Sequence, residues 1–337
     1  MLRILQLGFI LALVIWFPVV SSASTAHIEK LSGTVERCIA GQKLFKHAKI
    51  GGEIENGDII RTGPDGKAVL RLIDGSTMSF AEESEFMLGN ELDGSKKNLI
   101  GTFFRGVVRA VLTKQPGSYI ATPTGVIGIR GTDITLTHSG KMGFYFLDEG
   151  GVGIKTNKTT VLLDAGNMTA SYAGRKALPP SSFIKSSGLA EARSTLSALT
   201  SVEIPSSLKD HTLLNEILAR WVINYAHYLA ESGQLDDAET ALLIAEDMTG
   251  RHAVEGEILL QIGGLYFYRF KDVNSALRAY QKIINEYRET TYFENALFGV
   301  IRCYHLLEQP NKTKEYIQLY KKLFPSGKHL QELDALM

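Results

Sequence analysis

The feature that most constrains the fold is the stretch 118–136, which reads SYIATPTGVIGIRGTDITL. It combines β-branched and aromatic residues with three glycines spaced three residues apart, Gly125, Gly128 and Gly131. Val, Ile, Tyr and Thr fit a pleated surface, and a glycine inside a strand marks a bend, a bulge or a close backbone approach. The pattern predicts two strands that kink at the glycines. It disfavours a phosphate-binding loop, because no Gly-Lys-Ser/Thr and no amphipathic helix follow Gly131.

Strand-like runs separated by turn residues extend over residues 28–184. Ala68, Leu70 and Leu72 alternate with polar positions, as expected of a strand with one buried face. Turn signals such as Asp74-Gly75 separate the runs. The pattern predicts an all-β domain, and it leaves open whether this is a sandwich, a barrel or a short solenoid. The expected strands cover 33–37, 58–61, 68–73, 77–81, 86–88, 101–112, 143–147, 152–155 and 160–163.

The segment TPTGVIGIRGTD resembles the signature of FecR-type domains, all-β modules of the bacterial envelope. The resemblance extends to 57–80 and 143–154 and covers roughly residues 30–175. It implies a roll or solenoid-like arrangement of strands. We expect a mainly structural role for the motif residues, with the Arg130 guanidinium bonded to carbonyl groups or to a carboxylate such as Asp133. The motif residues are Thr122, Pro123, Gly125, Gly128, Arg130, Gly131, Thr132 and Asp133.

The first 26 residues have the layout of an export signal. A basic start precedes an apolar run over 4–20, and small residues follow at 21–23. We expect a cleaved signal peptide over residues 1–23 and a periplasmic mature chain that does not itself span the membrane. An uncleaved inner-membrane anchor is the alternative, although such an anchor usually needs nearer to about 20 apolar residues.

A change of composition marks residues 185–210, between Pro179-Pro180 and the next helical pattern, and we interpret it as a linker. From 211 to 337 the apolar period becomes helical and repeats. Val222, Leu260 and Leu297 are equivalent positions, with offsets of 38 and 37 residues. These offsets are slightly longer than the period of about 34 residues in tetratricopeptide (TPR) repeats, which the segment resembles. We expect about three helix pairs and a capping helix over 328–337.

In TPR stacks the first helix of each pair lines a concave surface that binds a partner. The resemblance places the partner-facing positions at Arg220, Ile223, His227, Gln261, Leu265, Tyr268, Arg269, Phe298, Arg302 and His305. Aromatic residues and arginines are frequent anchors of protein interfaces. A purely solvated helix face is the alternative.

The sequence shows no catalytic constellation, no metal-ligand spacing and no cofactor motif. We expect His138 to be a surface residue before a turn, and Asp148-Glu149 to be a solvated turn. The two cysteines, Cys38 and Cys303, offer no zinc spacing and are expected to be unpaired. With 36 basic and 36 acidic residues, no overall field attracts nucleic acid.

These features together predict a multidomain chain with a FecR-like β domain followed by a TPR-like helical solenoid. The leading hypothesis is a non-catalytic periplasmic scaffold or adaptor that binds a protein, a peptide or an envelope glycan. The first alternative is a sensory accessory subunit of a membrane receptor. The second is an envelope enzyme acting on glycans, which would need paired carboxylates at glycosidase separation.

Overall fold

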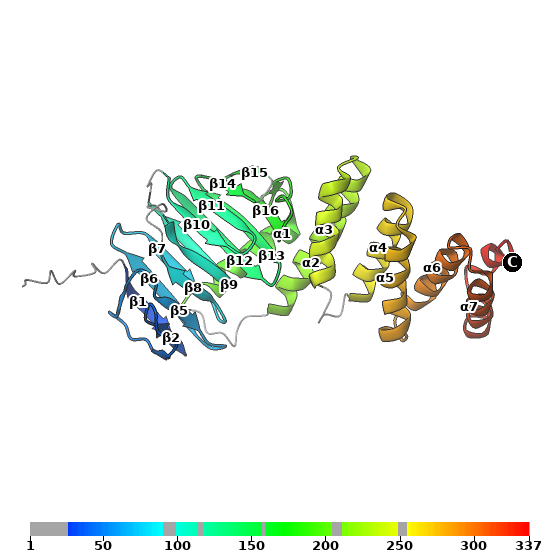
Figure 1. Ribbon diagram of the computed structural model, residues 1–337, viewed down its shortest axis with the longest axis horizontal. Coiled ribbons are helices and arrows are strands. Elements are labelled where there is room, and N and C mark those ends of the chain that lie inside the picture. Colours follow the sequence, from blue (N-terminus) through cyan, green and yellow to red (C-terminus); the bar gives the residue numbers. More distant parts are fainter. Residues whose placement is uncertain are drawn as a thin grey trace, which may run out of the picture.

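The computed structural model describes residues 26–89, 99–113, 117–156, 159–203, 211–248 and 255–336, without the side chains of 211–213. The predicted signal peptide lies outside these residues. The chain folds into a β region followed by a row of helices, and the two parts form one elongated body (Figure 1). The predicted order of β domain and helical region is confirmed. No helix within the described ranges is both long and apolar enough to cross a membrane.

Two sheets face each other in the β region and share one long bent strand, β9 (Leu99–Leu112). Sheet A runs in the order β4 (Glu53–Ile54), β1 (Ala26–Ser32), β6 (Lys67–Leu72), β7 (Thr77–Phe80), β9, β12 (Thr132–Ser139), β13 (Met142–Glu149), β16 (Asn167–Tyr172) and β17 (Ser181–Ser182). Sheet B runs in the order β3 (Phe45–His47), β2 (Val35–Cys38), β5 (Ile59–Thr62), β8 (Glu85–Leu88), β9, β10 (Tyr119–Thr122), β11 (Gly125–Ile129), β14 (Gly151–Lys155) and β15 (Thr160–Asp164). The apolar faces of both sheets meet in one core, as in a sandwich.

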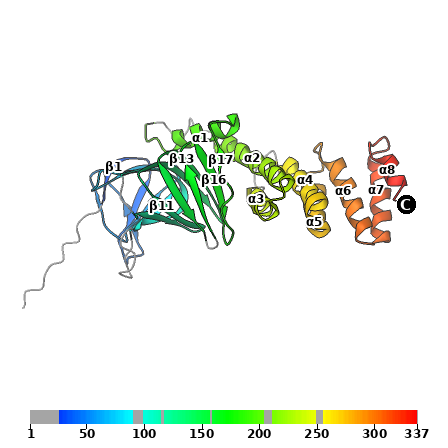
Figure 2. The ribbon, with the colours of Figure 1, turned by 90° about the horizontal axis from the view of Figure 1, so that it is seen from above.

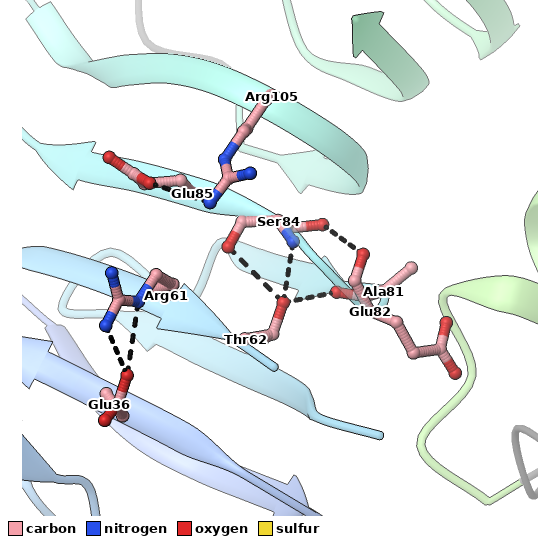
Figure 3. Close-up of polar contacts among 8 residues, drawn as sticks. All are labelled: Glu36, Arg61, Thr62, Ala81, Glu82, Ser84, Glu85 and Arg105. Atoms are coloured by element: carbon pink, nitrogen blue, oxygen red, sulfur yellow. Dashed lines mark hydrogen bonds and ion pairs between the residues drawn. The ribbon is translucent and has the colours of Figure 1, made fainter. Parts of the chain in front are cut away.

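Strand β9 passes from sheet B to sheet A at Gly106, whose φ of 99° is open only to glycine. A side chain at this position would collide with Ser84. The Ser84 hydroxyl donates to the carbonyl of Val107 at 3.0 Å, and the Ser84 amide donates to Thr62 Oγ1 at 2.8 Å. Thr62 Oγ1 in turn donates to the carbonyl of Ala81 at 2.7 Å (Figure 3). The bend is therefore held by a buried hydrogen-bond network.

The glycine-rich stretch 118–136 forms three strands and not the predicted two. Strands β10 and β11 pair as a hairpin in sheet B, and β12 continues in sheet A. The chain changes sheets at Gly131, which has a φ of 73°. It returns to sheet B at Gly150, and a side chain there would meet the Gly131 carbonyl oxygen at 2.0 Å. Two crossings thus pack backbone against backbone, which explains why glycine is needed at both.

The threonines of the same stretch anchor the β10–β11 turn to sheet A. The Thr124 hydroxyl lies 2.8 Å from the phenolic oxygen of Tyr145 and 2.7 Å from the hydroxyl of Ser171. Tyr145 is 1% exposed. Thr122 Oγ1 accepts a hydrogen bond from the Gly125 amide at 3.1 Å. A buried polar network of this kind fixes one arrangement of the two sheets, because each group would be costly to leave without a partner.

Helix α1 (Ser187–Leu199) lies within the segment interpreted as a linker, and it packs on the outer face of sheet A (Figure 2). Its buried residues Leu189 and Leu196 share one apolar core with Phe146 and Met168 of the sheet. The run Phe144–Leu147 is apolar throughout because β13 is buried on both faces. The same core continues into the next helices. Helix α1 therefore joins the sheet to the helical stack and is not part of a solvated linker.

The helices form a stack of antiparallel hairpins. The first is α2 (His211–Glu231) with α3 (Leu235–Met248), and the second is α4 (Glu255–Leu265), extended by a π-helix η2 (Tyr266–Phe270), with α5 (Val273–Glu286). The third is α6 (Phe293–Leu306) with α7 (Pro310–Leu323), followed by α8 (Leu330–Asp334).

Each hairpin turns at an equivalent left-handed residue, Gly233, Lys271 or Glu308. Each also buries the equivalent small residue of its second helix, Ala238, Ala276 or Thr313. The sequence repeat and the structural repeat therefore have the same register.

Candidate functional site: an aromatic–arginine pocket on the helical stack

A pocket opens where the first helices of the second and third hairpins lie side by side. Tyr280 of α5 sets their spacing, because its ring fits between Gly263 of α4 and Gly299 of α6. A Cβ at Gly263 would lie 2.4 Å from one edge of the ring, and a Cβ at Gly299 would lie 2.6 Å from the other. The two glycines let the large ring enter, and the helices stay far enough apart to leave a hollow above it.

The hollow has a volume of about 260 Å³ and contains three of the residues predicted to face a partner, Tyr268, Phe298 and Arg302. Tyr268 comes from η2 and is 52% exposed, whereas Phe298 and Arg302 project from α6. Residues 34 positions apart in the sequence thus meet at one place: the Arg302 guanidinium donates a hydrogen bond to the Tyr268 hydroxyl.

Arg302 is surrounded by aromatic faces. Its guanidinium carbon lies 4.7 Å from the ring centre of Phe267, 5.1 Å from that of Tyr268 and 5.7 Å from that of Phe298. These distances are within the range of cation–π attraction. Within the described part of the chain, no carboxylate forms an ion pair with Arg302. The pocket therefore presents the planar, charged guanidinium of Arg302 without a carboxylate partner from the described residues.

Two local departures from a regular helix shape the pocket. The π-helix at 266–270 re-aims the side chains that follow α4, and short π segments are frequent at functional sites. Gly264 follows Gly263, the glycine that contacts the Tyr280 ring, and it lines the pocket. A Cβ built on Gly264 would meet nothing within 4 Å. Its equivalents in the neighbouring hairpins, Ala226 and Ile301, are fully buried. Packing within the chain fills the equivalent positions of the other two hairpins, but it leaves the space beside Gly264 open.

Asn295 and His329 complete the wall, and sequence reasoning did not find them. The His329 ring stacks on Phe298 with ring centres 4.0 Å apart and planes 2° from parallel. Its Nε2 lies 3.0 Å from Asn295 Oδ1 and its Nδ1 lies 3.0 Å from Glu332 Oε1. His329 precedes α8, outside the hairpins, so no repeat position could have placed it in the pocket.

The other predicted partner-facing residues lie elsewhere on the stack. Arg220 lies 3.7 Å from carboxylate oxygens of both Glu216 and Glu257, and Arg269 pairs with Glu231 at 3.2 Å. His227 and Gln261 are half-buried, and burial lowers the pKa of His227 below its ordinary value. His305 lines a separate hollow of about 670 Å³ near α7.

Ile223 and Leu265 were expected to face a partner, and that expectation is wrong. Both are core residues, 0% and 1% exposed. The apolar stripe of a first helix faces its own hairpin and the next one, so these two aliphatic side chains are buried in the core between helices.

In the β region, the Arg130 guanidinium was expected to bond carbonyl groups or a carboxylate such as Asp133, and it bonds neither among the described residues. Arg130 is exposed at the corner between β11 and β12. Asp133 instead accepts two hydrogen bonds from Arg109 of β9, Nε to Oδ1 at 2.9 Å and Nη2 to Oδ2 at 2.6 Å. The positive φ of Gly131 reverses the chain between Arg130 and Asp133, which turns the two side chains apart.

His138 is buried, which corrects the expectation of a surface residue. It is 3% exposed, and neither ring nitrogen has a hydrogen-bond partner with good geometry in the described structure. Burial lowers its pKa to about 4, with the backbone at Phe104 opposing the shift. A neutral histidine enclosed in this way is a packing residue. Among the described residues, no group of three or more His, Cys, Asp or Glu side chains could hold a metal ion.

A comparison with protein families matches residues 58–153 to the family described as "FecR protein". Residues 58–153 are a FecR domain. The match contains the glycine-rich stretch and the three crossings between the sheets, at Gly106, Gly131 and Gly150, and it is shorter than the span of the sequence resemblance. No significantly similar curated protein was found.

Two solved structures, at 2.50 and 1.65 Å resolution, are similar to part of the chain. Both are of a "putative anti-sigma factor" from Parabacteroides distasonis ATCC 8503. Each is 10% identical with a TM-score of 0.32, and the similarity covers 37% of this chain and 59% of that chain.

Proposed function

We propose that this chain is a non-catalytic scaffold or adaptor of the bacterial envelope, in which the TPR-like stack binds a segment of a partner protein. Its FecR domain and the export signal expected from the sequence support the envelope setting. The helical hairpins support the binding role, because a stack of this kind offers an extended surface on which each repeat contacts only its neighbours.

The observation that carries the proposal is the pocket around Arg302. It combines exposed aromatic surface with a guanidinium that has no carboxylate partner in the described residues. Aromatic residues and arginine dominate the binding energy of protein interfaces. The complementary partner is a segment with one apolar or aromatic side chain, which enters the hollow, next to a carboxylate, which pairs with Arg302.

A displayed library of short peptides, selected on the folded chain, tests this directly. We expect enrichment of peptides with an aromatic or large aliphatic residue beside Asp, Glu or a free C-terminus. The double substitution of Tyr268→Ala and Arg302→Ala should weaken an enriched synthetic peptide by on the order of 2 kcal/mol or more.

Arg269→Ala is the matched control, because this arginine is on the same helical surface and pairs with Glu231. It should leave peptide affinity unchanged. Selected peptides that bind the double variant as well as the wild type, or that bind only through the FecR domain, would contradict the proposal.

A sensory accessory role is the second candidate, and the FecR domain is the observation that favours it. In that case the partner segment belongs to a membrane receptor. Crosslinking in intact cells, with a photoreactive residue in place of Phe298, would then capture a membrane protein, whereas a scaffold would capture a protein without a membrane-spanning segment.

A further inference from the structure

Another hollow lies far from the Tyr268–Arg302 pocket, between helix α1 and the outer face of sheet A. It has a volume of about 730 Å³, and its residues come from five strands, from the helix and from residues 200–203, which follow the helix. No part of the function proposed above uses it. Its lining is unlike that of the helical pocket, because it contains no aromatic side chain.

The floor of this cleft is one cross-strand row of sheet A. Lys30 is paired with Val69, Val69 with Ser79, and Ser79 with Arg109 across β1, β6, β7 and β9. The next residue in the row, Thr135 of β12, is fully buried, and its hydroxyl has no hydrogen-bond partner within the described ranges. The part of this row that lines the cleft therefore offers hydrogen-bonding groups from Lys30, Ser79 and Arg109, and Val69 is its single apolar side chain.

The roof of the cleft is the polar face of α1. Its leucines point into the core, while Arg193, Ser194 and Ser197 line the cleft. The residues along this face other than Arg193 are small, so they leave the space beneath the roof unfilled. No partner among the described residues bonds the hydroxyls of Ser79, Ser194 or Ser197, so these three groups face the cleft with their hydrogen-bonding capacity unused.

Charges in and behind the cleft are balanced in pairs. Arg109 is held by Asp133, Arg193 donates from Nε to both oxygens of Asp148 at 2.7 and 2.8 Å, and Lys30 pairs with Glu203 at 3.1 Å. The expectation that Asp148 belongs to a solvated turn is therefore wrong. Three cations face three carboxylates, so the cleft carries no net field for an anion or a cation. The remaining guanidinium N–H groups are still free to donate, because no described acceptor is bonded to Arg109 Nη1 or to Arg193 Nη1 and Nη2.

We propose that this cleft binds a neutral, polyhydroxylated ligand, a short segment of a glycan chain. Sugar hydroxyls donate to carboxylates and accept from guanidinium and serine groups at the same time, which matches the paired charges and unused hydroxyls of the lining. Charge balance disfavours a phosphate or another polyanion. The absence of large apolar side chains from the lining disfavours a peptide, whose anchors need deep apolar pockets.

Isothermal titration of the folded chain with neutral oligosaccharides tests the inference. The probes are cellotetraose, maltotetraose and N-acetylated chitotetraose, with inorganic phosphate and an uncharged tetrapeptide as representatives of the competing classes. We expect at least one oligosaccharide to bind with a Kd below about 1 mM, and phosphate and the tetrapeptide to bind more weakly.

Ser197→Phe places a ring in the cleft and should weaken oligosaccharide binding by roughly tenfold or more. Glu191→Phe adds the same ring to an exposed position of α1 outside the cleft, and it should leave binding unchanged. Because Ser197→Phe could disturb the seat of α1, the double change Ser79→Ala and Ser194→Ala provides a second variant. It removes two hydroxyls without adding bulk, and it should lower affinity several-fold at an unchanged melting temperature.

No binding of any oligosaccharide to the wild type would overturn the inference. So would binding that survives both cleft variants, or tighter binding of phosphate or the tetrapeptide. The Tyr268→Ala and Arg302→Ala variant should retain oligosaccharide binding, so a failure of the helical pocket and a failure of this cleft can be told apart.

Discussion

The neighbouring glycines Gly263 and Gly264 allow a sharp test of how the second and third hairpins pack. Alanine is a better helix former than glycine by about 0.8–1.0 kcal/mol. At Gly264 a Cβ would meet nothing within 4 Å, so Gly264→Ala should stabilise the chain by up to about that amount. Both glycines lie in α4 and both are replaced by alanine, so the gain in helix propensity is the same for the two variants.

At Gly263 the same methyl group would lie 2.4 Å from the ring of Tyr280. This is about an ångström closer than ordinary contact, and the ring cannot retreat because Gly299 of α6 closes its other edge. Overpacking of a filled site costs about 1–3 kcal/mol, and this contact belongs at the upper end. After the propensity gain, we expect Gly263→Ala to lower the free energy of unfolding by about 2 kcal/mol. The two variants should then differ by about 3 kcal/mol, with opposite signs.

Urea denaturation followed by circular dichroism measures both values. A Tyr280→Leu background supplies the decisive control, since a shorter side chain leaves room for the methyl group and the cost of Gly263→Ala should largely vanish there. Equal effects of the two alanines, or a cost at Gly263 that persists without the tyrosine ring, would refute the packing described here.

Three further outcomes are expected. Arg109→Ala should destabilise the β region by about 1–3 kcal/mol, because it leaves the mostly buried Asp133 without its partner. The exposed Arg130 is the control, and Arg130→Ala should change the free energy of unfolding by no more than about 0.5 kcal/mol. Equal melting temperatures of the two variants would contradict this. The pKa of His138 is about 4 in the folded chain, below the ordinary histidine value of 6.5, so the unfolded chain binds more protons between these limits and stability falls with falling pH. From about pH 7 to about pH 5 the loss should be about 2 kcal/mol, and His138→Leu should remove that part of the pH dependence in urea titrations. Burial raises the pKa of the Cys303 thiol to about 12, so this thiol should resist an aromatic disulfide reagent at neutral pH until the chain is unfolded, and prompt reaction in the folded state would show that the third hairpin opens.

Much of the β region could be predicted because its strands follow local rules. Alternating apolar residues and turn glycines located strands such as β6 and β7 to within a residue or two. The very short edge strands β3, β4 and β17 were missed, since two or three residues carry no periodic signal. The longer strands β1 and β16 were also absent from the expected set, and β16 shows no alternation because five consecutive residues of it are buried. The number of strands in the glycine-rich stretch was also missed, because a glycine that bends a strand and a glycine that passes between sheets look alike in sequence.

The helical pocket was partly predictable for the same reason. Repeat alignment placed Tyr268, Phe298 and Arg302 on first helices, and the structure brings them together. Which aliphatic neighbours are buried, and that His329 closes the pocket, depend on contacts between hairpins and on the segment before α8. Such contacts join residues distant in sequence, so no local pattern encodes them. The two cysteines are unpaired, as expected, and the structure adds that both are buried.

The shared core between sheet A and the first helices has a consequence for how the helical stack acquires order. In an array in which each hairpin is stabilised by its neighbours, ordering can begin anywhere and spread. Met168 and Phe146 of sheet A belong to the same core as Val222 of α2, so we expect the folded sheet to provide the surface on which the first hairpin becomes ordered. We expect order to spread outward from α1 and local stability to decline with distance from the sheet. Backbone amides of α7 and α8 should exchange fastest, and a ligand held between Tyr268 and Arg302 would extend the protected region toward the free end.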